Sequence, residues 1–166
     1  MPINLELKCK VGSLRKFRLI LRKAGGEYRG VLTQKDIYIK NNRALLKLRL
    51  QKEKNELIKY NRDESGRKRW SYYEILNVSG KAPENYFKSL FDVETVVEKK
   101  RELWIYKNTR IHLDKVKNLG LFLELETLVL NGKKEAGKRF NEIIRLLKLS
   151  TKNQILASYR DLMLKL

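Results

Sequence analysis

The chain has 166 residues, a length that fits one domain spanning 1–166. Its 38 Lys and Arg residues outweigh 19 Asp and Glu residues, so the formal net charge is +19, and 42% of the residues are hydrophobic. This composition excludes wholesale disorder, and one cysteine and one histidine exclude an internal disulfide, a cysteine-based zinc site and a histidine-rich metal site. With no visible apolar run of membrane-spanning length and no visible signal peptide, we expect a cytoplasmic protein with an anionic partner.

Strand patterns with a period of two run along most of the chain. In the first, over 3–11, Leu5 and Leu7 face one side while Glu6 and Lys8 face the other. Eight further strand patterns are separated by turn residues, over 27–33, 34–40, 43–51, 56–62, 70–78, 93–106, 109–114 and 121–130. Helical periods predict four helices, over 14–24, 84–91, 133–149 and 152–165.

The polar faces of these strands carry many charged side chains. Any single strand of this kind is explained by a solvated face. Seven or eight antiparallel strands, however, tend to curl and close, which would turn the charged faces into the lumen of a barrel. Such a lumen would be too charged to pack as a core and would need water, metal and a polyanion. The apolar outer faces would then be covered by the helices.

Two carboxylates lie two residues apart on one predicted strand. Glu124 and Glu126 would place oxygen ligands on the same side, about 6–7 Å apart by strand rise. Such oxygens suit Mg²⁺ or Mn²⁺, and facing Lys and Arg side chains would hold phosphate oxygens that the metal does not reach. No Walker loop and no GxGxxG motif is present, so a phosphate site here would not rest on a helix N-terminus.

Several stretches, in this order, together resemble the CYTH superfamily, which groups class IV adenylyl cyclases, thiamine triphosphatases and inorganic triphosphatases. They are NLELK at 4–8, then 34–39, LKLR at 46–49, 97–101, RIHLDKV at 110–116, LGLFLELE at 119–126 and 158–162. The resemblance covers nearly the whole chain, and the segments around His112 and Glu124 are most similar to the cyclase-like branch. It implies an α+β fold: a closed eight-stranded antiparallel β-barrel, or tunnel, with a charged lumen and helices packed outside.

The resemblance also implies the site. The metal ligands and catalytic carboxylates for Mg²⁺ or Mn²⁺ would be Glu6, Asp114, Glu124 and Glu126. The triphosphate would be bound by Lys8, Lys47, Arg49, Lys99, Arg101 and Arg110, with Lys10 and Lys59 as further candidates on the same strand faces. The chain departs from the family pattern in three places: Asn4 replaces a Glu, Asn61 a Lys, and Lys47 an Arg.

The nucleophile would decide the activity. Water would make the protein a triphosphatase, the activity we expect, whereas the ribose 3′-hydroxyl of ATP would make it an adenylyl cyclase releasing pyrophosphate. Two non-enzymatic alternatives stay open: a triphosphate sensor, suggested by Asn4, and a basic nucleic-acid-binding module, suggested by charge that the lumen does not use up. His112 is interpreted as a hydrogen-bonded structural residue and Cys9 as a small buried hydrophobe.

Overall fold

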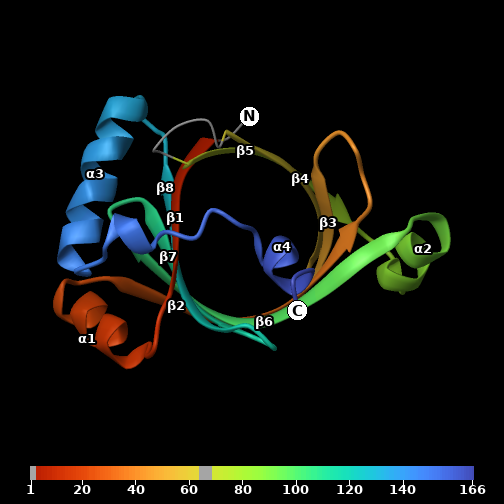
Figure 1. Cartoon of the computed structure of the whole chain (residues 1–166), viewed down its shortest axis with the longest axis horizontal. Coiled ribbons are helices and arrows are strands. Elements are labelled where there is room, and N and C mark those ends of the chain that lie inside the picture. The colour runs from red at the N-terminus through yellow and green to blue at the C-terminus, as the bar shows by residue number, and fades with distance from the viewer. Residues whose placement is uncertain (1–2, 64–68) are drawn as a thin grey trace.

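The computed structural model describes residues 3–63 and 69–166, in which eight antiparallel strands close into a barrel (Figure 1). The order around the ring is β1-β5-β4-β3-β2-β6-β7-β8, with β8 paired back to β1. The strands are β1 (Ile3–Lys10), β2 (Glu27–Ile39), β3 (Leu45–Leu50), β4 (Asn55–Asp63), β5 (Arg69–Val78), β6 (Val93–Tyr106), β7 (Thr109–Val116) and β8 (Gly120–Leu128). The predicted fold class is confirmed.

The main hydrophobic core lies outside the ring. Leu5 and Leu7 of β1, together with Ile111 of β7, pack with Phe17 of α1 (Arg15–Lys23) and Ile143 of α3 (Lys133–Leu146). Figure 1 shows both helices on one side of the barrel, beside β1, β7 and β8. Because successive side chains of a strand point to opposite faces, burying the apolar residues under these helices turns the alternate, charged residues into the lumen.

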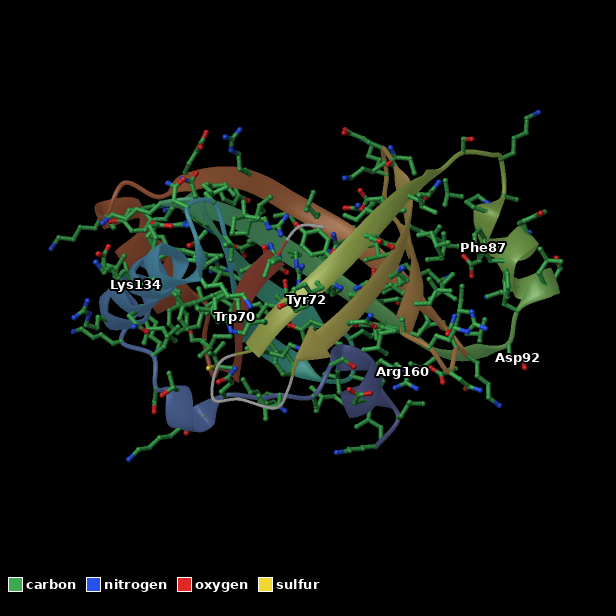
Figure 2. All side chains as sticks on the ribbon, turned by 90° about the horizontal axis from the view of Figure 1, so that it is seen from above. Trp70, Tyr72, Phe87, Asp92, Lys134 and Arg160 are labelled. Carbon is green, nitrogen blue, oxygen red and sulfur yellow. The ribbon has the colours of Figure 1, made fainter. Side chains whose placement is uncertain are left out.

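On the other side of the ring, α2 (Pro83–Leu90) projects away from the barrel and buries none of its residues. In Figure 2, Phe87 of α2 lies at the opposite end of the molecule from Lys134 of α3. Within the ranges the structure describes, none of the helices combines the length and apolar character needed to cross a lipid bilayer.

The end of the chain crosses the barrel instead of forming the long helix predicted over 152–165. A 3₁₀ turn, η1 (Thr151–Asn153), leads into an extended stretch that pairs with β1: the amide of Ile155 donates to the carbonyl of Lys8 at 2.8 Å. A short helix, α4 (Tyr159–Met163), then starts at Ser158, whose hydroxyl caps it. In Figure 1, α4 lies across the opening of the ring. The helix prediction was wrong here because pairing with the barrel outweighs local helical periodicity.

The strands predicted over 27–33 and 34–40 are one strand of 13 residues. The pairing of β2 with β6 is regular across the predicted boundary, where Thr33 lies opposite Lys100 and Gln34 opposite Lys99, and an irregularity lies earlier in the strand, between Tyr28 and Val31. Gly30 lies inside it with a φ of +99°, a conformation that glycine adopts at no steric cost. The strand therefore continues through a bulge rather than ending in a turn.

Candidate active site in the barrel lumen

The lumen contains a cavity of about 130 Å³. It brings together most of the predicted site residues, which come from five strands. The predicted residues that line it are Glu6, Lys8, Lys47, Arg49, Lys99, Arg101, Arg110, Glu124 and Glu126. Tyrosines and isoleucines complete the wall, namely Tyr38, Ile58, Tyr60, Tyr73, Ile75 and Tyr159.

One group of cations is held together by Asp36 of β2, a fully buried residue that the sequence analysis missed. Its carboxylate accepts from Lys47 at 3.0 Å, from Arg49 at 2.7 and 2.9 Å, and from Lys99 at 2.7 Å. Burial alone would raise the pKa of Asp36, but these three cations hold it well below its usual value. The signal in the sequence was an acidic residue on the polar side of the predicted strand 34–40.

A second group surrounds Arg101 of β6. The guanidinium donates to both oxygens of Asp114, at 2.8 and 2.6 Å, and to Glu124 at 2.5 Å. Glu124 also lies 3.2 Å from the Lys8 ammonium. Burial alone would raise the pKa of Glu124, but Lys8 and Arg101 hold it well below its usual value, so Glu124 is ionised.

Asp114, which was also predicted to be a metal ligand, lies apart from the other three. It is fully buried and does not line the cavity, and besides the two bonds from Arg101 it accepts one from the Tyr159 hydroxyl at 2.8 Å. Its oxygens are therefore engaged in fixing Arg101 and α4. The structure places Asp114 behind the site, as a group that orients a cation.

A third group lies around Glu126 of β8. Arg110 approaches its carboxylate to 2.9 Å, and Nδ1 of His112 lies 3.6 Å from its other oxygen. Burial would raise the pKa of Glu126, but His112 and Arg110 hold it at about 2. Burial and the charge of Arg101 lower the pKa of His112 to about 4, so the imidazole is neutral at physiological pH.

These side chains form a group that fits a divalent cation. Ligand atoms of His112, Glu124 and Glu126 all lie within 4.8 Å of one another. Both carboxylates are ionised, and Nδ1 of His112 is buried with no hydrogen-bond partner in the part of the chain that the structure describes. Glu6 lines the same cavity and is the register partner of Glu126, although it is not part of that group. Carboxylate oxygens are the ligands that Mg²⁺ and Mn²⁺ prefer.

The sequence matches the model of the CYTH domain over residues 2–159, nearly its whole length. The chain belongs to the CYTH domain family. No curated protein matches it.

Solved structures show the same CYTH fold at low sequence identity. The PH1012 protein of Pyrococcus horikoshii OT3 is 23% identical, with a TM-score of 0.84 over 96% of this chain and 98% of its own. A candidate adenylate cyclase of Vibrio parahaemolyticus is 17% identical, with a TM-score of 0.77 over 97% of both chains. HpAC1 of Hippeastrum, an adenylyl cyclase candidate described as having a dominant triphosphatase activity, is 10% identical, with a TM-score of 0.63 over 96% of this chain and 93% of its own.

Two cations predicted for the CYTH site lie outside the cavity. Lys59 points to the outer face of β4, where its ammonium lies 2.5 Å from Glu74, because Ile58 and Tyr60 occupy the lumen positions of that strand. The structure does not bring Lys59 to the lumen, because the pattern expected for the barrel, with charged residues inward and apolar residues outward, is reversed at this point of β4. Lys10 shares the lumen side of β1 but is exposed at its end, 5.9 Å from the Phe122 ring.

The two departures from the family pattern in β1 and β4 have different consequences. Asn4 lines the cavity and is buried, and none of the described residues forms a hydrogen bond with its Oδ1. Asn61 is exposed and lies on the outer side of β4 with Lys59. The change at position 4 therefore alters the lumen, whereas the change at position 61 does not.

A residue far along the chain closes the site. The ring of Tyr159 lies 4.2 Å from the Lys8 ammonium and 5.5 Å from that of Lys99. Lys8 also donates to the carbonyl of Ala157 at 3.0 Å. In the sequence, the segment 158–162 is recognisable only by its family resemblance. A tyrosine about thirty residues after the last strand gives no local signal that its side chain lies in the lumen.

Proposed function

We propose that this CYTH-domain protein binds a triphosphate together with Mg²⁺ or Mn²⁺ in the barrel lumen and hydrolyses it. The observation that carries the proposal is the convergence of six cations and the Glu124–Glu126 pair on one cavity. The family membership and the fold shared with HpAC1 support it. Its expected location is the cytoplasm, as the sequence analysis proposed.

The cations form two groups, and each group would bind a different end of the phosphate chain. Lys47, Arg49 and Lys99 form one group around Asp36, and Lys8, Arg101 and Arg110 form another around Glu124 and Glu126. Phosphoryl transfer needs chiefly positioning and neutralisation of the charge on the transferred and leaving groups. Arginines supply paired donors that match phosphate oxygens, and the lysines supply point charges.

Glu124 and Glu126 would hold the metal ion, with Glu6 on the same wall. A bound Mg²⁺ or Mn²⁺ polarises a phosphoryl oxygen and neutralises negative charge on it. The side chains do the remaining work: the basic groups orient the phosphate chain, and Asp114 and Asp36 keep Arg101, Arg49 and the lysines aimed at the lumen.

A class IV-type adenylyl cyclase is the second candidate. Tyr38, Tyr60 and Tyr73 line the cavity together with Ile58 and Ile75, so part of the wall is aromatic and apolar. Such a surface could pack against an adenine ring. The ribose 3′-hydroxyl, instead of water, would then attack the α-phosphorus and release pyrophosphate.

Phosphorus NMR separates these activities. The purified protein is incubated with ATP or tripolyphosphate, in Mg²⁺ and then in Mn²⁺. Orthophosphate or pyrophosphate without a cyclic phosphodiester signal is the expected result, and pyrophosphate with that signal would identify the cyclase. Line broadening without turnover in the Mg²⁺ samples would indicate a triphosphate sensor. No reaction and no binding would contradict the proposal and favour the nucleic-acid-binding alternative, which a salt-dependent gel-shift assay tests.

A further inference from the structure

The single histidine of the chain sits beside the two carboxylates with nothing bonded to one of its ring nitrogens. His112 is 4% exposed, and its Nδ1 has no hydrogen-bond partner among residues 3–63 and 69–166. The nearest acceptor, an oxygen of Glu126, lies 3.6 Å away, beyond hydrogen-bond distance. A buried nitrogen left unpaired costs stability, so such an atom calls for a ligand.

The place of this nitrogen is set by the sheet. His112 of β7 is the register partner of Glu124 of β8, and both side chains project to the lumen side of the wall. The imidazole does not itself line the cavity, but Glu124 and Glu126 do. Its nitrogen and the carboxylate oxygens lie within 4.8 Å of one another, so small side-chain movements bring all three to one cation.

We propose that Nδ1 of His112 is a direct ligand of the divalent cation, forming with Glu124 and Glu126 a nitrogen–oxygen site that selects Mn²⁺ over Mg²⁺. The inference rests on the proposed function for the presence of a metal ion, and it names which ion the site takes. Mg²⁺ prefers oxygen ligands and keeps its waters, whereas an imidazole nitrogen suits transition-metal ions. The two carboxylates neutralise the charge of one such ion.

The departure at position 4 agrees with this choice. Asn4 stands where the family pattern has a carboxylate, so this lumen offers one anionic oxygen fewer to a hard cation. The neutral imidazole nitrogen of His112, on β7, contributes less to Mg²⁺ binding than to Mn²⁺ binding. The composition of the site thus shifts from oxygen-only toward mixed ligands.

Basic side chains of the lumen already contact the two carboxylates that would bind the metal ion, so the experiment has to account for these ion pairs. Lys8 and Arg101 approach the two oxygens of Glu124, and Arg110 approaches one oxygen of Glu126. A bound triphosphate would draw these basic groups to its own oxygens and leave the carboxylates to the metal ion. Metal binding is therefore measured both without and with tripolyphosphate.

Because the chain has one histidine, pulsed electron paramagnetic resonance of Mn²⁺ can identify the ligand directly. Untagged protein is loaded with Mn²⁺, and the electron spin-echo modulation of a bound imidazole nitrogen is sought. We expect ¹⁴N modulation that changes to the ¹⁵N pattern when only histidine is labelled with ¹⁵N. This measurement uses the wild-type protein, so it does not depend on whether a variant folds.

The matched variant is His112→Asn, whose side-chain oxygen stands close to the position of Nδ1. We expect loss of the nitrogen modulation and a fall of about tenfold or more in Mn²⁺ affinity with a smaller change for Mg²⁺, since even groups that only support metal ligands change affinity by about 10–100-fold. Lys138→Gln, at an exposed position of α3, is the control and should leave both affinities unchanged.

Two results would overturn the inference. Bound Mn²⁺ without histidine modulation would make His112 a group that only positions Glu126, and the proposed triphosphate cleavage would stand. Absence of Mn²⁺ binding both with and without tripolyphosphate would overturn the metal site itself, and with it the metal-dependent part of the proposed function.

Discussion

At the scale of single residues, Glu126 tests the proposed metal site most cleanly. Its partner Arg110 has a side chain that is 31% exposed, so removing the carboxylate charge leaves a cation that water can still reach. Glu124, by contrast, is paired with Lys8 and Arg101, whose side chains are 1% and 6% exposed. Removing that charge would take one ionic partner away from each of two buried cations and would destabilise the barrel.

We expect Glu126→Gln to lower metal-dependent turnover about a hundredfold or more while the protein stays folded, a loss comparable to removing one group that stabilises transition-state charge. The measurement is the rate of phosphate release, with circular dichroism to verify folding. Glu74→Gln is the control, since Glu74 is paired with Lys59 on the outer face and is 49% exposed. Equal rates for the wild type and Glu126→Gln would exclude Glu126 as a required ligand.

His112 also gives the folded protein a pH dependence in the absence of metal. Its pKa is about 4 in the folded state against 6.5 in the unfolded chain, so the unfolded state binds more protons between these values. Stability therefore falls as pH drops from 6.5 to 4, by up to about 3 kcal/mol for this group. Urea unfolding in EDTA should show this loss, and His112→Asn should flatten it. A wild-type slope that the variant keeps would assign the effect to other groups.

At the scale of elements, α4 and the extended stretch before it tie the C-terminal part of the chain to the lumen. The Tyr159 ring packs edge-on against Phe122, and its hydroxyl donates to Asp114. Lys8 donates to the carbonyl of Ala157 on the same stretch. This segment therefore both covers an end of the barrel and fixes Lys8 and, through Asp114, Arg101.

Removing only the hydroxyl separates these two roles. We expect Tyr159→Phe to lower the free energy of unfolding by about 1.5–3 kcal/mol, the range for a hydrogen bond to a charged group, because the ring contacts with Phe122 and Lys8 are kept. Urea unfolding measures the change, and Tyr86→Phe, at an exposed tyrosine of α2, is the control. No change in stability would mean that Asp114 gains nothing from the hydroxyl.

At the scale of the whole molecule, the lumen is a network of opposite charges in which the carboxylates already hold the cations. Asp36 pairs with Lys47, Arg49 and Lys99, while Glu124 and Glu126 pair with cations of the second group. A triphosphate that binds alone must break pairs and leave carboxylates unmatched. When a triphosphate binds together with a divalent cation, its oxygens pair with the lysines and arginines, and the metal ion pairs with the carboxylates that those basic groups have left.

Binding of the two ligands should therefore be coupled. We expect tripolyphosphate to bind about tenfold or more tightly in the presence of Mn²⁺ than in EDTA, and Mn²⁺ affinity to rise by the same factor with tripolyphosphate, since coupling is reciprocal. Isothermal titration calorimetry of the wild-type protein with a non-hydrolysable tripolyphosphate analogue measures both. Repeating it at higher salt removes attraction by the exterior charge, which salt screens. Identical affinities with and without metal would contradict this account.

The sequence alone determined the barrel and most of its lumen. Alternation placed Lys8, Arg49, Arg101 and Glu124 on one side of their strands, and this holds because successive side chains of a strand must point to opposite faces. Once the apolar side was buried under the helices, the charged side could only face inward. The order of the motifs then identified the family without any spatial information.

Only the tertiary structure decided which of these charges meet. Lys59 faces outward because the lumen side of its strand is filled by Ile58 and Tyr60, and Asp36 became central because its two neighbouring strands, β3 and β6, bring three cations to it. The position of Tyr159 depends on a chain crossing that local periodicity does not encode. Strand alternation is a local property of the backbone, whereas pairing of buried charges depends on strand register and closure of the ring, which the whole chain sets together.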